Sequence, residues 1–186
     1  MDLQTLIARS EISDLLALYC RGLDRRDEAT LRAIYHDDAI EDRGSGLYIG
    51  PAQEWVGWTL GVLPVFRLTQ HGILNTLIEV DGDRAWGETY FQAYHRFGGD
   101  EGDKDEALSA QGVNTSELVW PEGESEVILA GRYLDRFERR DGVWKIAYRK
   151  MVCDWCRTQP VAEDWFRENP TAYRSVPHIS DARLPD

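Results

Sequence analysis

The stretch from His71 to Phe97, HGILNTLIEVDGDRAWGETYFQAYHRF, decides the fold class. Its first part, His71 to Val80, is rich in β-branched and aliphatic residues, and Asp81-Gly82 is a strong hairpin-turn signal. The second part, Arg84 to Phe97, has the aromatic content of a long strand. This stretch therefore predicts a strand that opens at His71 and returns as an antiparallel partner.

A second hairpin is predicted nearer the C-terminal end. Two further strand-like runs, Glu126 to Arg139 and Val143 to Trp155, flank the turn signal Asp141-Gly142. Two hairpins of this length indicate an antiparallel sheet, because a short turn can join only antiparallel neighbours.

The first third of the chain has the 3.6-residue period of amphipathic helices. One stripe recurs at i, i+3, i+4 and i+7: Ile12, Leu15, Leu16 and Tyr19. Gly22 is expected to loosen or end this helix, a short helix is predicted from Glu28 to Tyr35, and a third begins at Pro51. The buried side of the third helix is predicted to carry Trp55, Trp58 and Val62. Helices followed by long strands indicate an α+β domain, whose curved sheet and covering helices would enclose a cone-shaped pocket.

Composition indicates an ordinary globular protein, with 42% hydrophobic and 29% charged residues. The 33 acidic and 21 basic residues give a net charge of −12, which argues against binding nucleic acid or an anionic membrane. Three cysteines form no disulfide framework, and the N-terminal segment MDLQTLIARSE lacks the pattern of a signal peptide. We therefore expect a cytoplasmic location.

The chain is predicted to form one α+β domain over residues 1–159. Residues 98–124 contain GGDEGDKDE and are expected to form an inserted acidic loop, either solvated or acting as a flap. Residues 160–186 are expected to be a C-terminal extension with one short helix, Ala162 to Glu168.

Four polar residues lie among apolar ones in segments expected to be regular: Tyr19, Asp24, His71 and Arg132. They supply a phenol, a carboxylate, an imidazole and a fixed cation. This set can remove a proton from carbon and stabilise a departing anion without a cofactor. Five residues along an ideal helix place Tyr19 and Asp24 about 140° apart, so both could face one pocket only if the helix were distorted near Gly22.

Each of the four also has a structural interpretation. His71 could be a hydrogen-bonded core histidine, Asp24 could pair with the arginines that follow it, and Tyr19 could pack in the core. Arg132, which shares a strand face with Ala130 and Leu134, could form a salt bridge.

The C-x-x-C formed by Cys153 and Cys156 invites a redox or zinc interpretation. Residues three apart on a strand point to opposite faces, and the chain has no second ligand pair. We therefore expect buried, unreactive thiols and no metal site.

Three segments together resemble the SnoaL-like group of the nuclear transport factor 2-like superfamily: LLALYCRGLDRRDEATLRAIYHDDAI, HGILNTLIEVDGDRAWGETYF and GRYLDRFERRDGVWKIAYRK. The resemblance covers about Ile7 to Trp155. It is strongest to the cofactor-free elimination branch that includes hexachlorocyclohexane dehydrochlorinase, scytalone dehydratase and bile-acid 7α-dehydratase. It implies the cone-shaped α+β barrel of that superfamily.

The resemblance also implies roles for the four polar residues. His71 would be the general base, and Asp24 would fix its tautomer and stabilise the imidazolium. Arg132 falls on an arginine of a later long strand, and Tyr19 on a position that is tyrosine or lysine in the group. These two would stabilise the departing group or an enolate-like intermediate. Four further residues are expected to contact substrate: Asn75, which shares a strand face with His71 and Ile73, together with Trp55, Trp58 and Tyr90.

We therefore expect a cofactor-independent, dehydratase-like lyase that acts on a small apolar cyclic or aromatic substrate. The leaving group could be water, halide or formaldehyde. An isomerase of the same fold is one alternative. A non-catalytic binding protein, such as the small subunit of a ring-hydroxylating dioxygenase, is another. A homodimer or homotrimer is expected from the resemblance alone.

Overall fold

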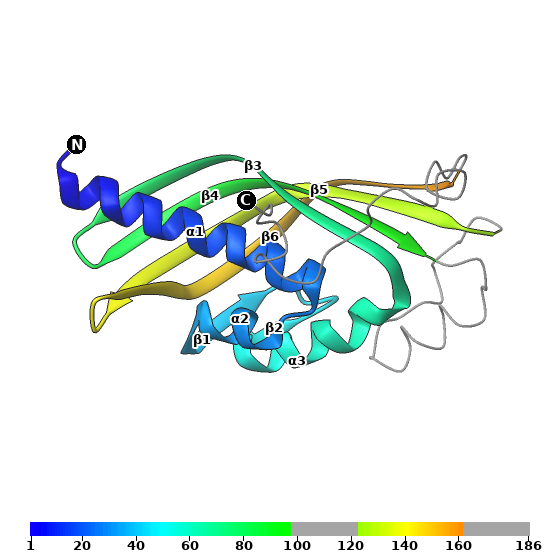
Figure 1. Cartoon of the computed structure of the whole chain (residues 1–186), viewed down its shortest axis with the longest axis horizontal. Helices are drawn as coiled ribbons and strands as arrows, with labels where there is room; N and C mark the ends of the chain where they lie inside the picture. Colours follow the sequence, from blue (N-terminus) through cyan, green and yellow to red (C-terminus); the bar gives the residue numbers. More distant parts are fainter. Residues whose placement is uncertain (98–122, 162–186) are drawn as a thin grey trace, which may run out of the picture.

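One mixed β-sheet organises the chain, and α1 lies across one of its faces (Figure 1). The structure is a computed structural model that describes residues 1–97 and 123–161. Its strands are β1 (Tyr35–Asp42), β2 (Ile49–Pro51), β3 (Phe66–Asp81), β4 (Arg84–Phe97), β5 (Ser125–Arg140) and β6 (Val143–Pro160). They lie in the order β2-β1-β6-β5-β4-β3, and every neighbouring pair is antiparallel except β1 and β6.

The first helix, α1 (Leu3–Arg25), is longer than its apolar stripe and continues through Gly22. The Asp2 side chain caps its start by accepting a hydrogen bond from the Thr5 N–H at 2.8 Å. The expected break at Gly22 is absent. A Cβ at this position would lie 2.7 Å from Leu31 Cγ, so the glycine instead permits close packing of α1 against α2 (Glu28–Ala33).

The predicted helix from Glu28 to Tyr35 is wrong at its C-terminal end. The chain leaves the helix after Ala33, and Tyr35 begins β1, which pairs in parallel with β6. Neither β1 nor β2 was predicted from the sequence. The third helix, α3 (Ala52–Val62), follows Pro51 directly, as predicted, and a short 3₁₀ helix η1 (Leu63–Val65) leads into β3.

Both predicted hairpins are present. β3 and β4 reverse at Asp81-Gly82, where Gly82 has φ 57°, and β5 and β6 reverse at Asp141-Gly142, where both φ angles are positive. The expectation that His71 opens its strand is wrong, because β3 begins five residues earlier at Phe66. His71 therefore lies within the strand, with residues paired to β4 before and after it.

The α+β fold class is confirmed, and the curved sheet remains open, with β2 and β3 as its edges (Figure 1). Irregular register occurs in β3 between Ile73 and Thr76, and in the β5–β6 pair between Ala130 and Gly131. Bulges of this kind bend a strand and increase its twist. The concave face of the sheet and the helices enclose the core.

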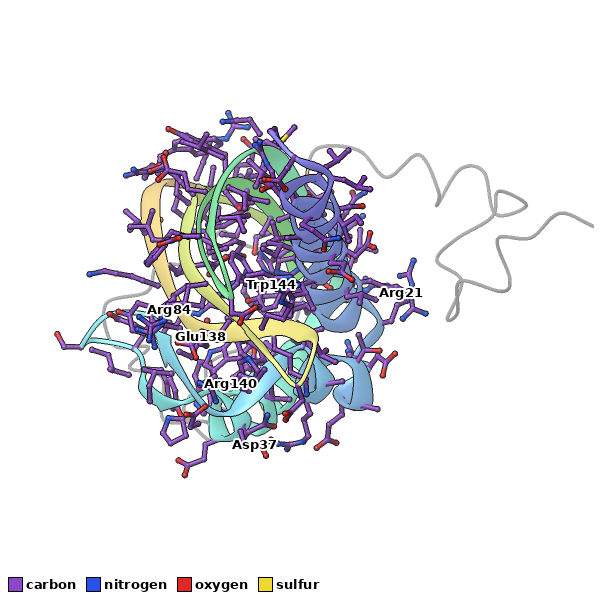
Figure 2. All side chains as sticks on the ribbon, turned by 90° about the vertical axis from the view of Figure 1, so that its left-hand side faces the viewer. Arg21, Asp37, Arg84, Glu138, Arg140 and Trp144 are labelled. Carbon is purple, nitrogen blue, oxygen red and sulfur yellow. The ribbon has the colours of Figure 1, made fainter. Side chains whose placement is uncertain are left out.

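Buried apolar side chains from the helices and from the inner sheet face form one main cluster, which includes Ile12, Leu16, Leu31, Val56, Phe91, Phe137 and Ile146. Figure 2 shows Trp144 directed into this interior, whereas Arg21 projects from the outer side of α1. None of the described helices is both long and apolar enough to cross a membrane. The predicted loop falls almost wholly on residues 98–122, and the predicted C-terminal helix on residues 162–186; both ranges lie outside the described residues.

Candidate active site

The end of α1 and the middle of β3 bring Asp24 and His71 together. The Nδ1 atom of His71 lies 2.7 Å from Oδ1 of Asp24, and the His71 backbone N–H donates to Oδ2 at 2.9 Å. The two side chains are only 9% and 15% exposed. A carboxylate at Nδ1 fixes the proton there, which leaves Nε2 of the neutral ring as an acceptor.

Asp24 is ionised at neutral pH. Burial acts to raise its pKa, but the hydrogen bonds and charge of His71 outweigh burial, so the pKa of Asp24 lies below its ordinary value. A negative charge thus faces the imidazole from behind, where it stabilises the ring after protonation.

A cavity of about 170 Å³ lies beside His71, enclosed by α1, α3 and the inner sheet face. Its walls are mainly apolar and aromatic, with Tyr19, Trp55, Trp58 and Phe91 among them. Few polar groups in an apolar cavity are typical of a small-molecule site. An apolar cavity of roughly 150 Å³ can hold benzene, so this cavity suits a compound with one ring.

The geometry of α1 resolves the difficulty of the 140° angle. Tyr19 lines the cavity, whereas Asp24 lines a separate outer hollow of about 380 Å³, and His71 borders both spaces. The imidazole therefore stands between the carboxylate and the cavity. The expected distortion of the helix is not needed, because Asp24 supports His71 without facing the cavity itself.

Arg132 lies on the opposite face of the sheet, and the expectation that it faces the pocket is wrong. Its side chain makes two hydrogen bonds of 3.1 Å to Asp154 and approaches Glu88 at 3.5 Å. Side chains alternate along a strand, and the neighbouring Tyr133 of β5 takes the inward position. Of the four residues from the sequence, Tyr19 and His71 line the cavity, and Asp24 supports His71 from outside it.

Two of the predicted substrate contacts are also on the outside. Tyr90 is 37% exposed, with its ring 5.9 Å from the Arg132 guanidinium, because Phe91 takes the inward position on β4. Asn75 is exposed because the irregular register after Ile73 breaks the alternation that would have placed it beside His71. Trp55 and Trp58 do line the cavity.

The cation at the cavity is Arg43, which the sequence analysis missed. It follows β1 directly, and its side chain is only 7% exposed. Its NH2 group lies 2.5 Å from Oε1 of Glu41 and donates to the Tyr19 hydroxyl, and its guanidinium lies 4.5 Å from the centre of the Trp55 ring. A basic residue that follows the acidic segment HDDAIED and precedes a turn-rich stretch was the only sequence signal.

A buried charge network supports this part of the cavity. Glu41 is fully buried and accepts a hydrogen bond of 2.8 Å from the Tyr35 hydroxyl. Burial raises the pKa of Glu41, while the positive charge of Arg43 opposes that shift. Arg149 forms a bidentate pair with Asp135 and lies 4.2 Å from the centre of the Tyr19 ring. Tyr19 is therefore fixed between two guanidinium groups.

His95 of β4 also lines the cavity, in edge contact with His71 at a ring separation of 5.2 Å. Burial lowers the pKa of His95 to about 3, and the nearby His71 lowers it further in the same direction. His95 is thus neutral in the folded protein, and it adds a second imidazole beside the proposed base.

The cysteines behave differently from their prediction. Cys153 and Cys156 are exposed on β6, whereas Cys20 is buried, and all three are free. The expectation of buried thiols is wrong for the C-x-x-C pair because the end of β6 is exposed along its length. Among the described residues, no group of three or more His, Cys, Asp or Glu side chains could hold a metal ion.

Comparisons with known proteins agree with this architecture. The chain is 31% identical over 150 residues to hexachlorocyclohexane dehydrochlorinase 1 of Sphingobium indicum, covering 78% of this chain and 81% of that protein. It is 30% identical to a gamma-hexachlorocyclohexane dehydrochlorinase of Sphingobium indicum, covering 83% and 85%. These relatives support the prediction of a lyase-type, dehydratase-like enzyme.

Solved structures show the same fold. A type 2 hexachlorocyclohexane dehydrochlorinase superposes with a TM-score of 0.68 at 24% identity, covering 89% of this chain and 99% of that one. A scytalone dehydratase-like protein of Novosphingobium aromaticivorans gives 0.63 at 20% identity, covering 86% and 97%. The SnoaL-like domain family itself matches residues 4–150. This chain therefore belongs to the SnoaL-like family.

Proposed function

We propose that this protein is a cofactor-independent lyase that eliminates a small leaving group from a cyclic substrate, with His71 as the general base. The observation that carries the proposal is the His71–Asp24 pair at the wall of an apolar cavity. The 2.7 Å contact leaves Nε2 of His71 free to accept a proton, and the mainly apolar cavity wall offers few polar groups that would hold competing water.

The reaction begins when Nε2 of His71 takes a proton from a ring carbon of the substrate. The C–H bond breaks, and its electron pair forms a double bond to the adjacent carbon. The bond from that carbon to the leaving group breaks. A halide departs as the anion, and His71 then releases its proton to solvent; a hydroxyl takes the proton from His71 and departs as water. Asp24 offsets the charge of the imidazolium throughout.

The relatives support elimination as the reaction class. Their names describe removal of hydrogen chloride from hexachlorocyclohexane, a six-membered ring. A single ring of this kind is also what a cavity of about 170 Å³ can accommodate. An isomerase would use the same proton removal but would return the proton to another carbon.

Product masses test this function directly. The wild-type protein and His71→Ala would be incubated with halogenated and hydroxylated single-ring compounds. We expect the wild type to produce a loss of water or hydrogen halide, and His71→Ala to be slower by about 10²–10⁴-fold. His36→Gln is the matched control, because His36 is a described histidine outside the cavity that contacts the Glu138 carbonyl at 2.9 Å.

The outcomes separate the candidate functions. A product of unchanged mass and new retention time would identify an isomerase. Equal turnover by the wild type and His71→Ala would refute His71 as the base. An Asp24→Asn variant gives an independent readout: its amide would donate to Nδ1, so ¹⁵N NMR should show the proton of His71 moved to Nε2.

A further inference from the structure

The cavity cation narrows the substrate class. We infer that Arg43 is an oxyanion-binding residue and that the natural substrates are ring compounds carrying a carbonyl oxygen. This inference rests on the proposed elimination by His71, and it concerns a residue on a different wall of the same cavity.

The hydrogen-bonding capacity of Arg43 is only partly used. NH2 contacts Glu41 and the Tyr19 hydroxyl, while NH1 donates to the sulfur of Met151 at 2.8 Å. A thioether is a weak acceptor. The Nε atom is buried and has no hydrogen-bond partner within residues 1–97 and 123–161. Arg43 and Met151 both line the cavity. Because buried guanidinium donors are normally satisfied, an oxygen of a bound ligand is the stronger acceptor that NH1 lacks.

The position of Arg43 is also fixed before any ligand binds. Its guanidinium lies over the Trp55 ring at 4.5 Å and within 5.7 Å of the Tyr133 ring. Glu41, itself fully buried and bonded to Tyr35, holds it from the other side. A preorganised donor in a mainly apolar cavity is effective where negative charge develops during a reaction.

The chemistry of the base explains why a carbonyl is required. Imidazole is a weak base, so it removes a carbon-bound proton readily only when the resulting charge is delocalised. With a carbonyl next to the reacting carbon, the C–H bond breaks as Nε2 of His71 takes the proton, and the electron pair moves onto the oxygen to form an enolate. Arg43 would then donate to that oxygen, with Tyr19 beside it.

The second half of the reaction restores the carbonyl. Electrons return from the enolate oxygen, a carbon–carbon double bond forms, and the bond to a hydroxyl on the next carbon breaks. The proton held by His71 passes to the departing hydroxyl, which leaves as water, so the imidazole is neutral again. Hexachlorocyclohexane has no oxygen and would leave Arg43 without an acceptor.

Binding of an enolate mimic tests the inference without turnover. Cyclohexane-1,3-dione is an anionic ring enolate at neutral pH, and cyclohexanone is its uncharged counterpart. By isothermal titration calorimetry, we expect the wild type to prefer the dione by about tenfold or more, the size of a charge-assisted hydrogen bond. The double variant Arg43→Met/Glu41→Gln removes both buried charges together, so that neither is left unpaired, and it should lose the preference.

A further variant keeps the test specific. Arg132→Met removes an arginine from the outer face and should keep the preference. Equal binding of both compounds by the wild type, or an undiminished preference in the double variant, would overturn the inference. Because binding requires no proton removal, failure of the proposed elimination would leave this readout intact. Efficient turnover of hexachlorocyclohexane with no dione preference would refute the role of Arg43 alone.

Discussion

The buried pair Asp135–Arg149 offers the sharpest test of what holds this site together. Asp135 of β5 and Arg149 of β6 lie opposite each other in the sheet, and both side chains are 0% exposed. Two hydrogen bonds of 2.8 and 2.7 Å join them. The rings of Tyr19 and Tyr133 lie 4.2 and 4.4 Å from the guanidinium, so water has little access to it.

The perturbation is Asp135→Asn, which preserves shape but removes the negative charge. Arg149 would then be a buried cation without a counter-charge, and breaking a buried pair in this way costs about 3–5 kcal/mol. That loss is a large part of the roughly 5–15 kcal/mol that stabilises a typical domain. With a urea slope of about 2 kcal/mol per molar, the midpoint of unfolding should fall by about 2 M.

Urea unfolding followed by tryptophan fluorescence and circular dichroism measures this change. The matched control is Asp83→Asn, whose partner Arg139 lies at 2.6 Å but whose own side chain is 67% exposed. Exposed pairs contribute about 0–1 kcal/mol. The double variant Asp135→Leu/Arg149→Met should regain most of the stability, because an apolar pair carries no desolvation cost. A loss below about 1 kcal/mol for Asp135→Asn would refute the reasoning.

Other predictions follow from single contacts. Burial lowers the pKa of His95 from 6.5 to about 3. Between those pH values the unfolded state binds a proton at His95 that the folded state does not. The free energy of unfolding therefore falls as the pH falls, by up to about 1.4 kcal/mol per pH unit. His95→Phe should remove this slope in urea titrations at pH 7 and pH 5; an unchanged slope would contradict the assignment. A Cβ on Gly131 would lie 2.0 Å from the Val152 carbonyl oxygen, so Gly131→Ala should lower the free energy of unfolding by about 1–3 kcal/mol or more and lower the thermal midpoint. Gly46→Ala, whose Cβ would meet open space, should change the thermal midpoint little. The Cys20 thiol has a pKa raised to about 12 by burial, so a thiol reagent should label only the two exposed cysteines of β6 rapidly, and a third rapid label would contradict its burial.

Features fixed by local chemistry were predicted well from the sequence. Gly82 and both residues of Asp141-Gly142 have positive φ angles, which glycine and aspartate tolerate, and the long strands around these turns bury one face. β1 was missed because its segment HDDAIED is polar and acidic, and it forms a strand through pairing with β6 and β2. Pairing between distant segments leaves no local periodicity to read.

The residues of the candidate site were likewise predicted only in part. Asp24 and His71 were identified, and the structure places them in contact. The inward face of β5 was misassigned, because alternation gives two possible faces and the sequence around Arg132 has apolar residues on both. Arg43 lies outside the long strands, and only the enclosing helices and sheet make its side chain buried.

The continuity of α1 has a consequence for how this site can vary. The phenol of Tyr19 and the carboxylate of Asp24 belong to one unbroken helix, whereas His71 belongs to β3. A single residue inserted in the last turns of α1 would advance Asp24 by about 1.5 Å and rotate it by about 100°, enough to break its 2.7 Å contact with His71. Insertions after the helix would leave that distance unchanged. The spacing between positions 19 and 24 is thus a fixed length of the site, and changes of length after α1 do not alter it.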